Sequence, residues 1–276
     1  MRIRAGTRLL AVVGDPVAHS LSPRMHNAAL AALGVDAVYL ALRVGPDGFE
    51  ALSRGLLAAG AGLNVTVPHK RLAAALADEP SDLVRRTGAC NVLRATLRGI
   101  EADNTDAEAI AAAARGLARG LPVRRALLVG TGGSARSAAV GLSQSWPEVV
   151  VDVRSRDAGR LREFLQWAEG AGVTAEPGRE TGVDLVVNAT PLGLLPSDPL
   201  PLEESDLRSR APAAVLDLTY ARGRTRLVRA ARRLGLEAED GRTVLVEQGA
   251  ASFALFVGAP APVEVMRAAV QESLGD

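Results

Sequence analysis

Cysteine and long apolar runs are both scarce in this sequence of 276 residues. The single cysteine, Cys90, cannot form an internal disulfide, so an oxidising compartment would not stabilise the fold. No apolar run reaches the ~18 residues that a membrane span requires, and the N-terminus has no signal-type apolar stretch. We therefore expect a cytoplasmic protein that makes no use of a membrane.

An excess of charge of one sign is also lacking, because 32 basic residues nearly balance 31 acidic ones. No basic stripe interleaved with aromatic residues is present, which argues against nucleic acid as the main partner. The three histidines, His19, His26 and His69, have a spacing that suits no standard metal site, so we expect no metal. We expect His69 at a pocket wall or at the surface.

Aromatic residues make up only 3% of the chain against 48% hydrophobic residues, so the core must be built from Ala, Val and Leu. Short β-type runs alternate with Ala/Leu-rich helical segments along almost the whole length. Apolar strands without internal alternation, such as 126–129, are typical of parallel sheets covered on both faces. The pattern predicts an α/β fold with two units, and Gly116, Gly120 and Pro122 mark a break that is one candidate boundary.

A glycine turn follows the strand at 126–129 and precedes a predicted helix at 134–142. Gly130, Gly132 and Ala135 match the pattern G-x-G-x-x-A, in which the first Gly makes a tight turn and the second lets backbone approach a pyrophosphate. This context favours a dinucleotide site, although an ordinary glycine turn would have the same pattern.

The end of the next strand bears on which dinucleotide binds. Asp152 lies 20 residues after Gly132, where an acid that binds ribose hydroxyls indicates NAD. Arg154, which follows at the strand end, would instead suit the 2′-phosphate of NADP. Spacing alone leaves both open, and Asp152 could equally be a solvent-facing residue of the strand.

Small polar and charged residues gather at other strand-to-helix junctions. Ser20 and Ser22 can present hydroxyls at a helix N-terminus, where a carboxylate would be stabilised, although Ser22 could simply cap the helix. Lys70 lies near a helix N-terminus, which the helix dipole makes unfavourable for a cation, and this hints at function. Asp106 ends an extended run just before a helix and could be a plain N-cap.

Seven short segments of the sequence occur in the order and spacing that they have in shikimate dehydrogenases. The chain resembles that family over nearly its whole length. The matching segments are His19-Ser20-Leu21-Ser22-Pro23, Asn64-Val65-Thr66-Val67-Pro68-His69-Lys70, Asn104-Thr105-Asp106, Gly130-Thr131-Gly132-Gly133, Asn188-Ala189-Thr190, Asp217 with Tyr220, and Gln248.

The resemblance implies an NADPH-dependent enzyme of aromatic amino acid biosynthesis, in the pathway to chorismate, that reversibly reduces 3-dehydroshikimate to shikimate. Lys70 and Asp106 would be its catalytic pair. The substrate would be held by Ser20, Ser22, Thr66, Asn91, Tyr220 and Gln248. NADP would be held by Gly130, Thr131, Gly132, Gly133, Ser134, Arg154, Ser155, Asn188, Thr190, Leu218 and Gly241, with Asp82 as a weaker correspondence.

The resemblance also implies the domain organisation. A mixed α/β substrate domain would comprise residues 1–106 and 238–276, and a Rossmann-type doubly wound domain with a parallel sheet would comprise residues 107–237. The active site would lie in the cleft between them. We expect a small-molecule substrate, a hydroxylated cyclic carboxylic acid, and a monomer or homodimer.

Some positions depart from the family pattern and leave alternatives open. Val92 and Arg222 stand where the family usually has Thr and Pro, which leaves open quinate or an amino-substituted analogue as substrate. Val153 replaces an Asn before the cofactor-binding Arg, so use of NAD or of both cofactors also stays open. Val244 replaces a Met that the family has close to the nicotinamide. A more distant alternative is a non-catalytic NADP-binding sensor, against which the presence of Lys70 and Asp106 argues.

Overall fold

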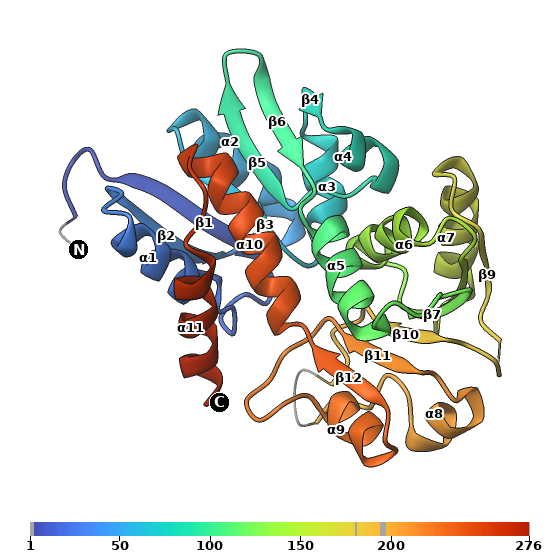
Figure 1. Cartoon of the computed structure of the whole chain (residues 1–276). Helices are drawn as coiled ribbons and strands as arrows, with labels where there is room; N and C mark the ends of the chain where they lie inside the picture. The colour runs from blue at the N-terminus through green and yellow to red at the C-terminus, as the bar shows by residue number, and fades with distance from the viewer. Residues whose placement is uncertain (1–2, 180, 194–196, 276) are drawn as a thin grey trace. The chain divides into compact units, whose positions relative to one another are not determined.

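The computed structural model describes residues 3–179, 181–193 and 197–275. It divides the chain into two compact units, one with the described residues up to Asp106 together with Leu245–Gly275, the other with those of Ala107–Val244. Each unit is built around its own sheet, labelled in Figure 1. No helix in the described ranges is long and apolar enough to cross a membrane.

The first unit has a mixed sheet with the strand order β2-β1-β3-β5-β6-β4. β1 pairs in parallel with β2 and β3, β5 runs antiparallel to both β3 and β6, and β4 pairs in parallel with β6. The strands are β1 (Arg8–Gly14), β2 (Ala37–Arg43), β3 (Gly62–Val65), β4 (Glu79–Pro80), β5 (Val92–Thr96) and β6 (Gly99–Asp103). β1 and β3 therefore end at the same edge, where polar residues follow both of them.

The helices of the first unit carry four of the predicted site residues, Ser22, Lys70, Asp82 and Gln248. They are α1 (Ser22–Ala32), α2 (Pro46–Ala58), α3 (Lys70–Ala75), α4 (Asp82–Thr87) and α11 (Val263–Leu274), together with α10 (Arg242–Val257) from Leu245 onward. One core cluster combines residues of β1, β3 and β5 with α2 and α3, and it is made largely of Ala, Val and Leu as the composition requires. α11 packs against α1.

The second unit has a wholly parallel sheet in the order β12-β11-β10-β7-β8-β9. Counted from its first strand this is the order 3-2-1-4-5-6 of a Rossmann fold, in which ligands bind beyond the carboxyl ends of the strands where the order reverses. The strands are β7 (Arg125–Val129), β8 (Val150–Arg154), β9 (Ala175–Pro177), β10 (Leu185–Asn188), β11 (Ala214–Asp217) and β12 (Glu237–Asp240). The reversal falls between β7 and β10, and the glycine turn directly follows β7.

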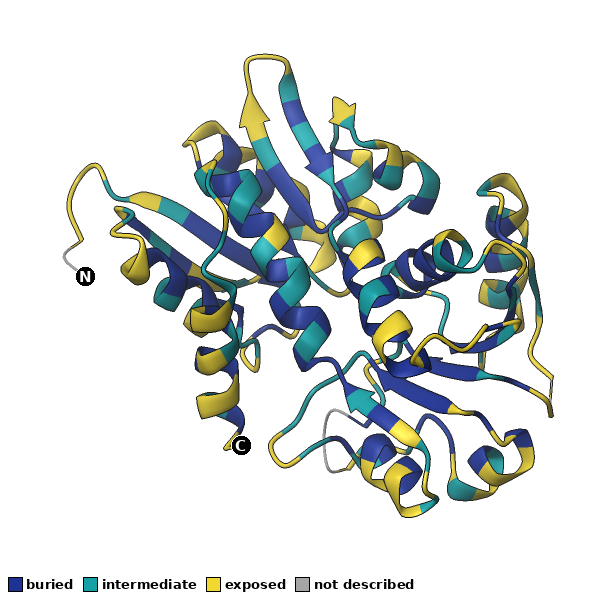
Figure 2. Ribbon diagram, viewed as in Figure 1, coloured by how far each residue is buried: buried dark blue, intermediate teal, exposed yellow. Residues whose placement is uncertain are grey.

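Helices accompany this sheet as the alternation in the sequence predicts. They are α5 (Asp106–Ala118), α6 (Gly133–Ser145), α7 (Ala158–Gly170), α8 (Glu204–Arg210) and α9 (Arg226–Arg233). The residues of β7, β10 and β11 are buried almost throughout, and Figure 2 shows these strands in dark blue. The predicted fold class, two α/β units of which one is of Rossmann type, is confirmed.

The division between the units corrects one predicted boundary. The sequence placed the return to the substrate domain at residue 238, but the second unit continues to Val244. The reason is that β12 pairs with β11 as the outermost strand of the parallel sheet, with Glu237 opposite Ala214. α10 begins at Arg242, so its first three residues belong to the second unit and the rest to the first.

Candidate active site

Ser20 and Ser22 lie where the chain passes from β1 into α1. Ser22 is the first residue of α1, and the N-cap position is taken by Leu21, for which the structure has no side-chain cap hydrogen bond. The Ser20 hydroxyl accepts a hydrogen bond from the Ser22 amide at 3.3 Å. The alternative that Ser22 merely caps the helix is therefore wrong, and two small hydroxyl side chains stand at this helix start.

Lys70 is the first residue of α3, which follows the carboxyl end of β3 by a short loop. Its Nζ lies 2.5 Å from Oδ2 of Asp106, with side chains only 13% and 10% exposed. Asp106 is the first residue of α5. A cation at a helix N-terminus is disfavoured by the dipole, so this short contact with a carboxylate is what holds the ammonium there.

The preceding residue, His69, is not at the surface or at a pocket wall as expected. It is fully buried, its ring stacks on Phe49 with centroids 4.5 Å apart, and its Nε2 lies 2.7 Å from the carbonyl oxygen of Val44. These contacts fix the turn that carries Lys70 and make His69 a structural residue.

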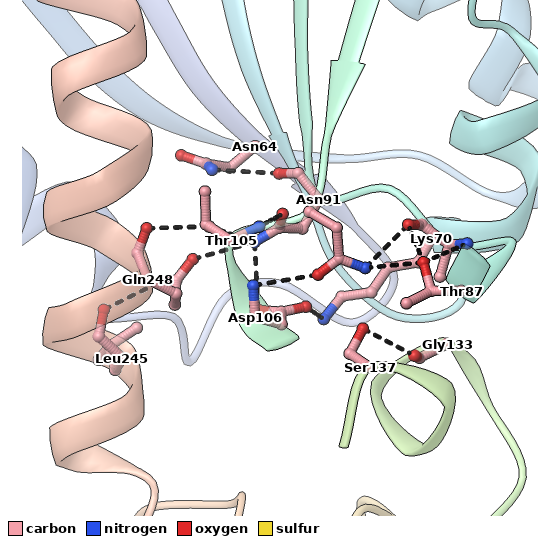
Figure 3. Close-up of polar contacts among 12 residues, drawn as sticks. Asn64, Lys70, Thr87, Asn91, Thr105, Asp106, Gly133, Ser137, Leu245 and Gln248 are labelled. Atoms are coloured by element: carbon pink, nitrogen blue, oxygen red, sulfur yellow. Dashed lines mark hydrogen bonds and ion pairs between the residues drawn. The ribbon is translucent and has the colours of Figure 1, made fainter. Parts of the chain in front are cut away.

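Asn91 is the centre of the polar cluster around Asp106 (Figure 3). Its Oδ1 accepts from the Thr105 amide at 2.8 Å, which fixes the amide orientation. Its Nδ2 then lies 3.1 Å from Asp106 Oδ1, 2.9 Å from Thr105 Oγ1 and 3.3 Å from Gln248 Oε1. Gln248 comes from α10, and the backbone carbonyl of this residue accepts from the Thr105 hydroxyl at 3.0 Å. Residues far apart in the sequence thus meet at one place within the first unit.

The backbone of Asp106 is positioned by a second buried amide. Asn104 Oδ1 accepts from the Asp106 amide at 3.1 Å, while Asn104 Nδ2 donates to the carbonyl of Ala89 at 2.9 Å and to Thr87 Oγ1 at 3.1 Å. The alternative that Asp106 is a plain N-cap is wrong, because both of its carboxylate oxygens are held by side chains of the cluster.

Thr87, Thr105 and Asn64 are members of this cluster that the sequence-based site did not include. Asn64 lies in β3 two residues before Thr66, and its Nδ2 donates to the carbonyl of Asn91 at 3.1 Å. The alternation of Asn64 with Thr66 was a usable signal, since residues i and i+2 of an extended strand face one way. Thr87 is a single hydroxyl in a short helix and gave no such signal.

Other predicted residues of the first unit stand apart from the cluster or are inert. Asp82 begins α4, its side chain is 97% exposed, and it pairs with Arg85 at 2.6 Å, so no described contact joins it to the cluster.

Cys90 is buried, and burial raises the pKa of its thiol to about 12, which makes it inert as a nucleophile. Burial lowers the pKa of His26 to about 3, so its buried ring stays neutral. The described residues include no His, Cys, Asp and Glu group suited to a metal ion.

The glycine turn of the second unit joins β7 to α6 and contains a left-handed glycine. Gly130 has φ +113°, and a Cβ there would meet Thr190 Cγ2 at 3.0 Å and the Ala189 carbonyl oxygen at 3.2 Å. Gly132 is the N-cap of α6 without any side-chain cap, and a Cβ on it would have no atom within 4 Å. The first N–H groups of α6, at Gly133 and Ser134, thus start a helix beside open space, and Thr131 completes the turn.

The residues of β8 and just after it bear on the choice between NAD and NADP, which the spacing in the sequence left open. Asp152 is fully buried and its Oδ1 lies 2.6 Å from Arg125 Nη1, so it is neither solvent-facing nor placed to bind a ribose. Burial raises the pKa of this carboxyl in spite of the arginine. Arg154 instead is 44% exposed and contacts Asp206 at 3.1 Å. The Ser155 hydroxyl donates to the carbonyl of Asp157 at 3.1 Å, so its proton is already used within the turn.

A second group of predicted cofactor residues lies at the carboxyl ends of β10 and β11. Asn188 is buried, its Nδ2 donates to Asp217 Oδ1 at 2.8 Å, and its Oδ1 accepts from the Thr190 amide and hydroxyl at 3.1 and 2.7 Å. Burial raises the pKa of Asp217 in spite of four hydrogen bonds that lower it. These bonds fix the ends of two neighbouring strands next to the reversal of the sheet.

Gly241 and Leu218, two further predicted cofactor residues, lie next to one another in this unit, and Leu218 directly follows β11. A Cβ on Gly241 would meet the Leu218 carbonyl oxygen at 2.3 Å, so only glycine allows these backbones to approach so closely. Tyr220, predicted to bind substrate, is a partly buried residue of the loop after β11 in the second unit. The remaining predicted substrate residues all belong to the first unit.

Comparison with known proteins gives the family whose pattern these residues follow. A family model described as shikimate dehydrogenase substrate binding domain matches residues 12–93, and one described as shikimate 5′-dehydrogenase C-terminal domain matches residues 241–271. The chain is 43% identical to a shikimate dehydrogenase (NADP(+)) of Anaeromyxobacter sp. strain K and 40% identical to one of Methanopyrus kandleri, covering 98–99% of each relative and 99% of this chain. The shikimate 5-dehydrogenase structure of Thermus thermophilus in complex with NADP(H) and shikimate is 34% identical, with a TM-score of 0.81 over 96% of this chain and 99% of that one.

Proposed function

The chain belongs to the shikimate dehydrogenase family, and on that basis we propose that Lys70 and Asp106 are its catalytic pair. The protein is an oxidoreductase with NADP as cofactor, and it interconverts a CH–OH group of shikimate and the ketone of 3-dehydroshikimate. Its place is in the formation of aromatic amino acids. The observation that carries the assignment of the pair is the contact of 2.5 Å between Lys70 Nζ and Asp106 Oδ2 in a nearly buried setting.

The pair can supply and remove the proton of this reaction. NADPH, when bound, supplies the hydride that reduces the ketone. As negative charge develops on the ketone oxygen, the Lys70 ammonium stabilises it and donates a proton, and in the oxidation of shikimate the neutral amine accepts that proton. Asp106 orients the ammonium through Oδ2 while Asn91 holds Oδ1, so the carboxylate cannot rotate away.

The residues around the pair suit a ligand rich in hydroxyl groups and bearing one carboxylate. Asn91 and Gln248 lie in one hydrogen-bonded cluster with Asp106, and we assign them with Thr66 to the ring hydroxyls. Ser20 and Ser22 stand at the start of α1, where hydroxyls and helix N–H groups favour an anion, and we assign them with Tyr220 to the carboxylate. Such neutral donors select by geometry, since a misfitting ligand leaves them without partners.

The second unit has the donors that NADP needs. We assign the pyrophosphate to the turn from Gly130 to Ser134, where α6 begins without a side-chain cap. Arg154 is assigned to the 2′-phosphate, with Ser155 beside it as a backbone contact. We assign the nicotinamide end to the carboxyl edge of the sheet, to Asn188, Thr190, Leu218 and Gly241. Asp82 has only the resemblance in its favour.

We accordingly assign substrate binding to the first unit, with Tyr220 as the one contribution from the second, and NADP binding to Ala107–Val244. The engagement of Asp152 by Arg125 removes the acid that NAD would use, so nothing in the described residues favours the NAD-dependent alternative.

The test is the reduction of NADP⁺ by the purified protein at alkaline pH with shikimate as sole substrate, then quinate, and with NAD⁺ in place of NADP⁺. We expect turnover with shikimate and NADP⁺, much less with quinate, and little with NAD⁺. A Lys70→Met variant in the same assay serves as the control for a contaminating dehydrogenase. Tight NADPH binding without any turnover would indicate the sensor instead, and faster oxidation of quinate than of shikimate would overturn the substrate assignment.

A further inference from the structure

A buried tyrosine lies behind the polar cluster of the first unit, on the strand next to β1. Tyr39 belongs to β2, is fully buried, and its hydroxyl lies 2.7 Å from Oδ1 of Asn64. Neither the catalytic pair nor the substrate residues assigned above include it. Only the side-chain amide of Asn64 lies between its hydroxyl and the backbone carbonyl of Asn91.

The direction of each hydrogen bond in this chain follows from the atoms involved. The carbonyl oxygen of Asn91 can only accept, and it takes bonds from the Val65 amide at 2.9 Å and from Asn64 Nδ2 at 3.1 Å. The Asn64 amide must therefore turn its nitrogen toward Asn91 and its oxygen toward Tyr39. Because that oxygen only accepts, the Tyr39 hydroxyl has to be the donor.

Among the described residues, no other donor can fully replace this hydroxyl. Ser252 Oγ of α10 lies 3.4 Å from Asn64 Oδ1, but its single proton also has the Gly249 carbonyl within 3.0 Å. Ser252 is one helical turn from Gln248, so the two side chains share a face of α10. The hydroxyl of Tyr39 is thus the main source of a proton for a buried acceptor.

The position of Tyr39 itself is fixed from two sides. The Asn27 side chain bonds both backbone groups of Tyr39, accepting from its amide at 2.9 Å and donating to its carbonyl at 2.8 Å. The His26 ring stacks on the Tyr39 ring with centroids 4.2 Å apart and an angle of 6°. The hydroxyl therefore points at Asn64 from a rigid support.

We propose that Tyr39 is a positioning residue for substrate binding. Its hydroxyl satisfies Asn64 Oδ1, which keeps Asn64 Nδ2 on the Asn91 carbonyl and so holds Asn91 in the place from which it contacts Asp106 and Gln248. Without that hydroxyl a buried acceptor loses its donor, and the Asn64 side chain gains stability by turning away from Asn91. This inference rests on the proposed function, because its readout is the Michaelis constant for shikimate.

The first experiment is the Tyr39→Phe variant, which keeps the ring and its stacking on His26. We expect the KM for shikimate to rise by about five- to 150-fold, the range for loss of a donor to a buried group, with a smaller effect on kcat. The KM for NADP⁺ should stay unchanged. Ser53→Ala is the matched control, because it removes a buried hydroxyl of the same unit that has no hydrogen-bond partner in the described residues.

A double-variant cycle separates positioning from a general loss of packing. Tyr39→Phe in an Asn64→Ala background should raise the KM no further, since the residue through which it acts is gone. Ser252→Ala alone should change the KM little, but combined with Tyr39→Phe it should raise the KM more than the two single effects predict. An equal effect of Tyr39→Phe with and without Asn64 would overturn the proposal.

A second route applies if Tyr39→Phe does not fold. Asn64→Asp keeps the acceptor for Tyr39 but sets a carboxylate oxygen against the Asn91 carbonyl, so the KM should again rise. An unchanged KM in either folded variant, with an active wild-type enzyme, would refute the role of Tyr39. Absence of shikimate oxidation by the wild-type protein would instead refute the proposed function, so the two failures are distinguishable.

Discussion

The Lys70–Asp106 pair should make separate contributions to stability and to turnover, and a double replacement can separate them. Lys70→Met removes the charge but keeps much of the length of the side chain, and Asp106→Asn keeps an oxygen for Asn91. Each single variant leaves one nearly buried charge and removes the opposite charge that lies 2.5 Å from it. The double variant leaves no charge at all.

The exposure of the two side chains sets the expected size of the effect. Breaking a fully buried pair costs about 3–5 kcal/mol of unfolding free energy and breaking an exposed one ~1 kcal/mol or less. With 13% and 10% of the side chains exposed, the pair lies near the buried end, so we expect about 2–4 kcal/mol for each single variant. The double variant should be less destabilised than either single one, while its turnover stays about 10²–10⁴-fold below wild type because general acid–base catalysis is lost.

The assay has to follow the first unit. Both tryptophans, Trp146 and Trp167, lie in the second unit, so their fluorescence reports on unfolding there. Hydrogen exchange of peptides from β3 and β5, measured through a urea series, follows the sheet that carries the site. A double variant as unstable as the sum of the two single variants would refute the coupling, and recovery of turnover in it would refute the catalytic role.

Three further predictions concern the second unit. Arg154→Ala should raise the KM for NADP⁺ about ten- to hundred-fold, as loss of a hydrogen bond to a charged group does, and leave the KM for NAD⁺ nearly unchanged; equal effects on both would contradict its assignment to the 2′-phosphate. Burial raises the pKa of Asp217, so the folded state binds its proton more tightly than the unfolded state, and the free energy of unfolding should fall as pH rises from near 4 through the raised pKa. That decline, followed by tryptophan fluorescence in urea, should be missing in Asp217→Asn, and parallel pH profiles would contradict it. Gly141→Ala should destabilise the unit by about 1–3 kcal/mol because its Cβ would lie 2.3 Å from the Ala107 carbonyl oxygen, whereas Gly116→Ala, in a helix with open space around it, should stabilise by ~0.5–1 kcal/mol; thermal unfolding of the pair checks both.

The sequence predicts the second unit well because each of its elements has a local cause. Buried parallel strands appear in the sequence as short apolar runs. Gly130, which directly follows such a strand, has φ +113°, and a glycine turn between a strand and a helix is typical of a dinucleotide site. The errors arise where a long-range contact decides. Asp152 has the spacing of a ribose-binding acid, yet Arg125 on the neighbouring strand engages it. The boundary at residue 238 was wrong because β12 joins the sheet by pairing with β11.

The proposed catalytic pair could be predicted only through the order of the motifs. Local pattern alone left Asp106 as a possible N-cap, and only its contact with Lys70 distinguishes the two roles. Tyr39 and Thr87 could not be found in this way, because one reads as a core strand residue and the other as a helix residue. Their hydroxyls matter through partners far along the chain, and pairings of that kind are not encoded in any short segment.

The uncharged amides of the cluster around Asp106 are each held in one orientation. A free asparagine amide can flip, and then donor and acceptor exchange places. In the first unit a backbone atom prevents this at each of three positions: the Asn91 carbonyl accepts from Asn64, the Thr105 amide donates to Asn91, and the Ala89 carbonyl accepts from Asn104. Backbone groups cannot change roles, so each side chain keeps one arrangement of donors and acceptors. A change of Asn to Asp at position 64 or 104 would therefore set two acceptors against each other, whereas Asn to Ala would only leave a gap, and the isosteric change should be the more damaging of the two.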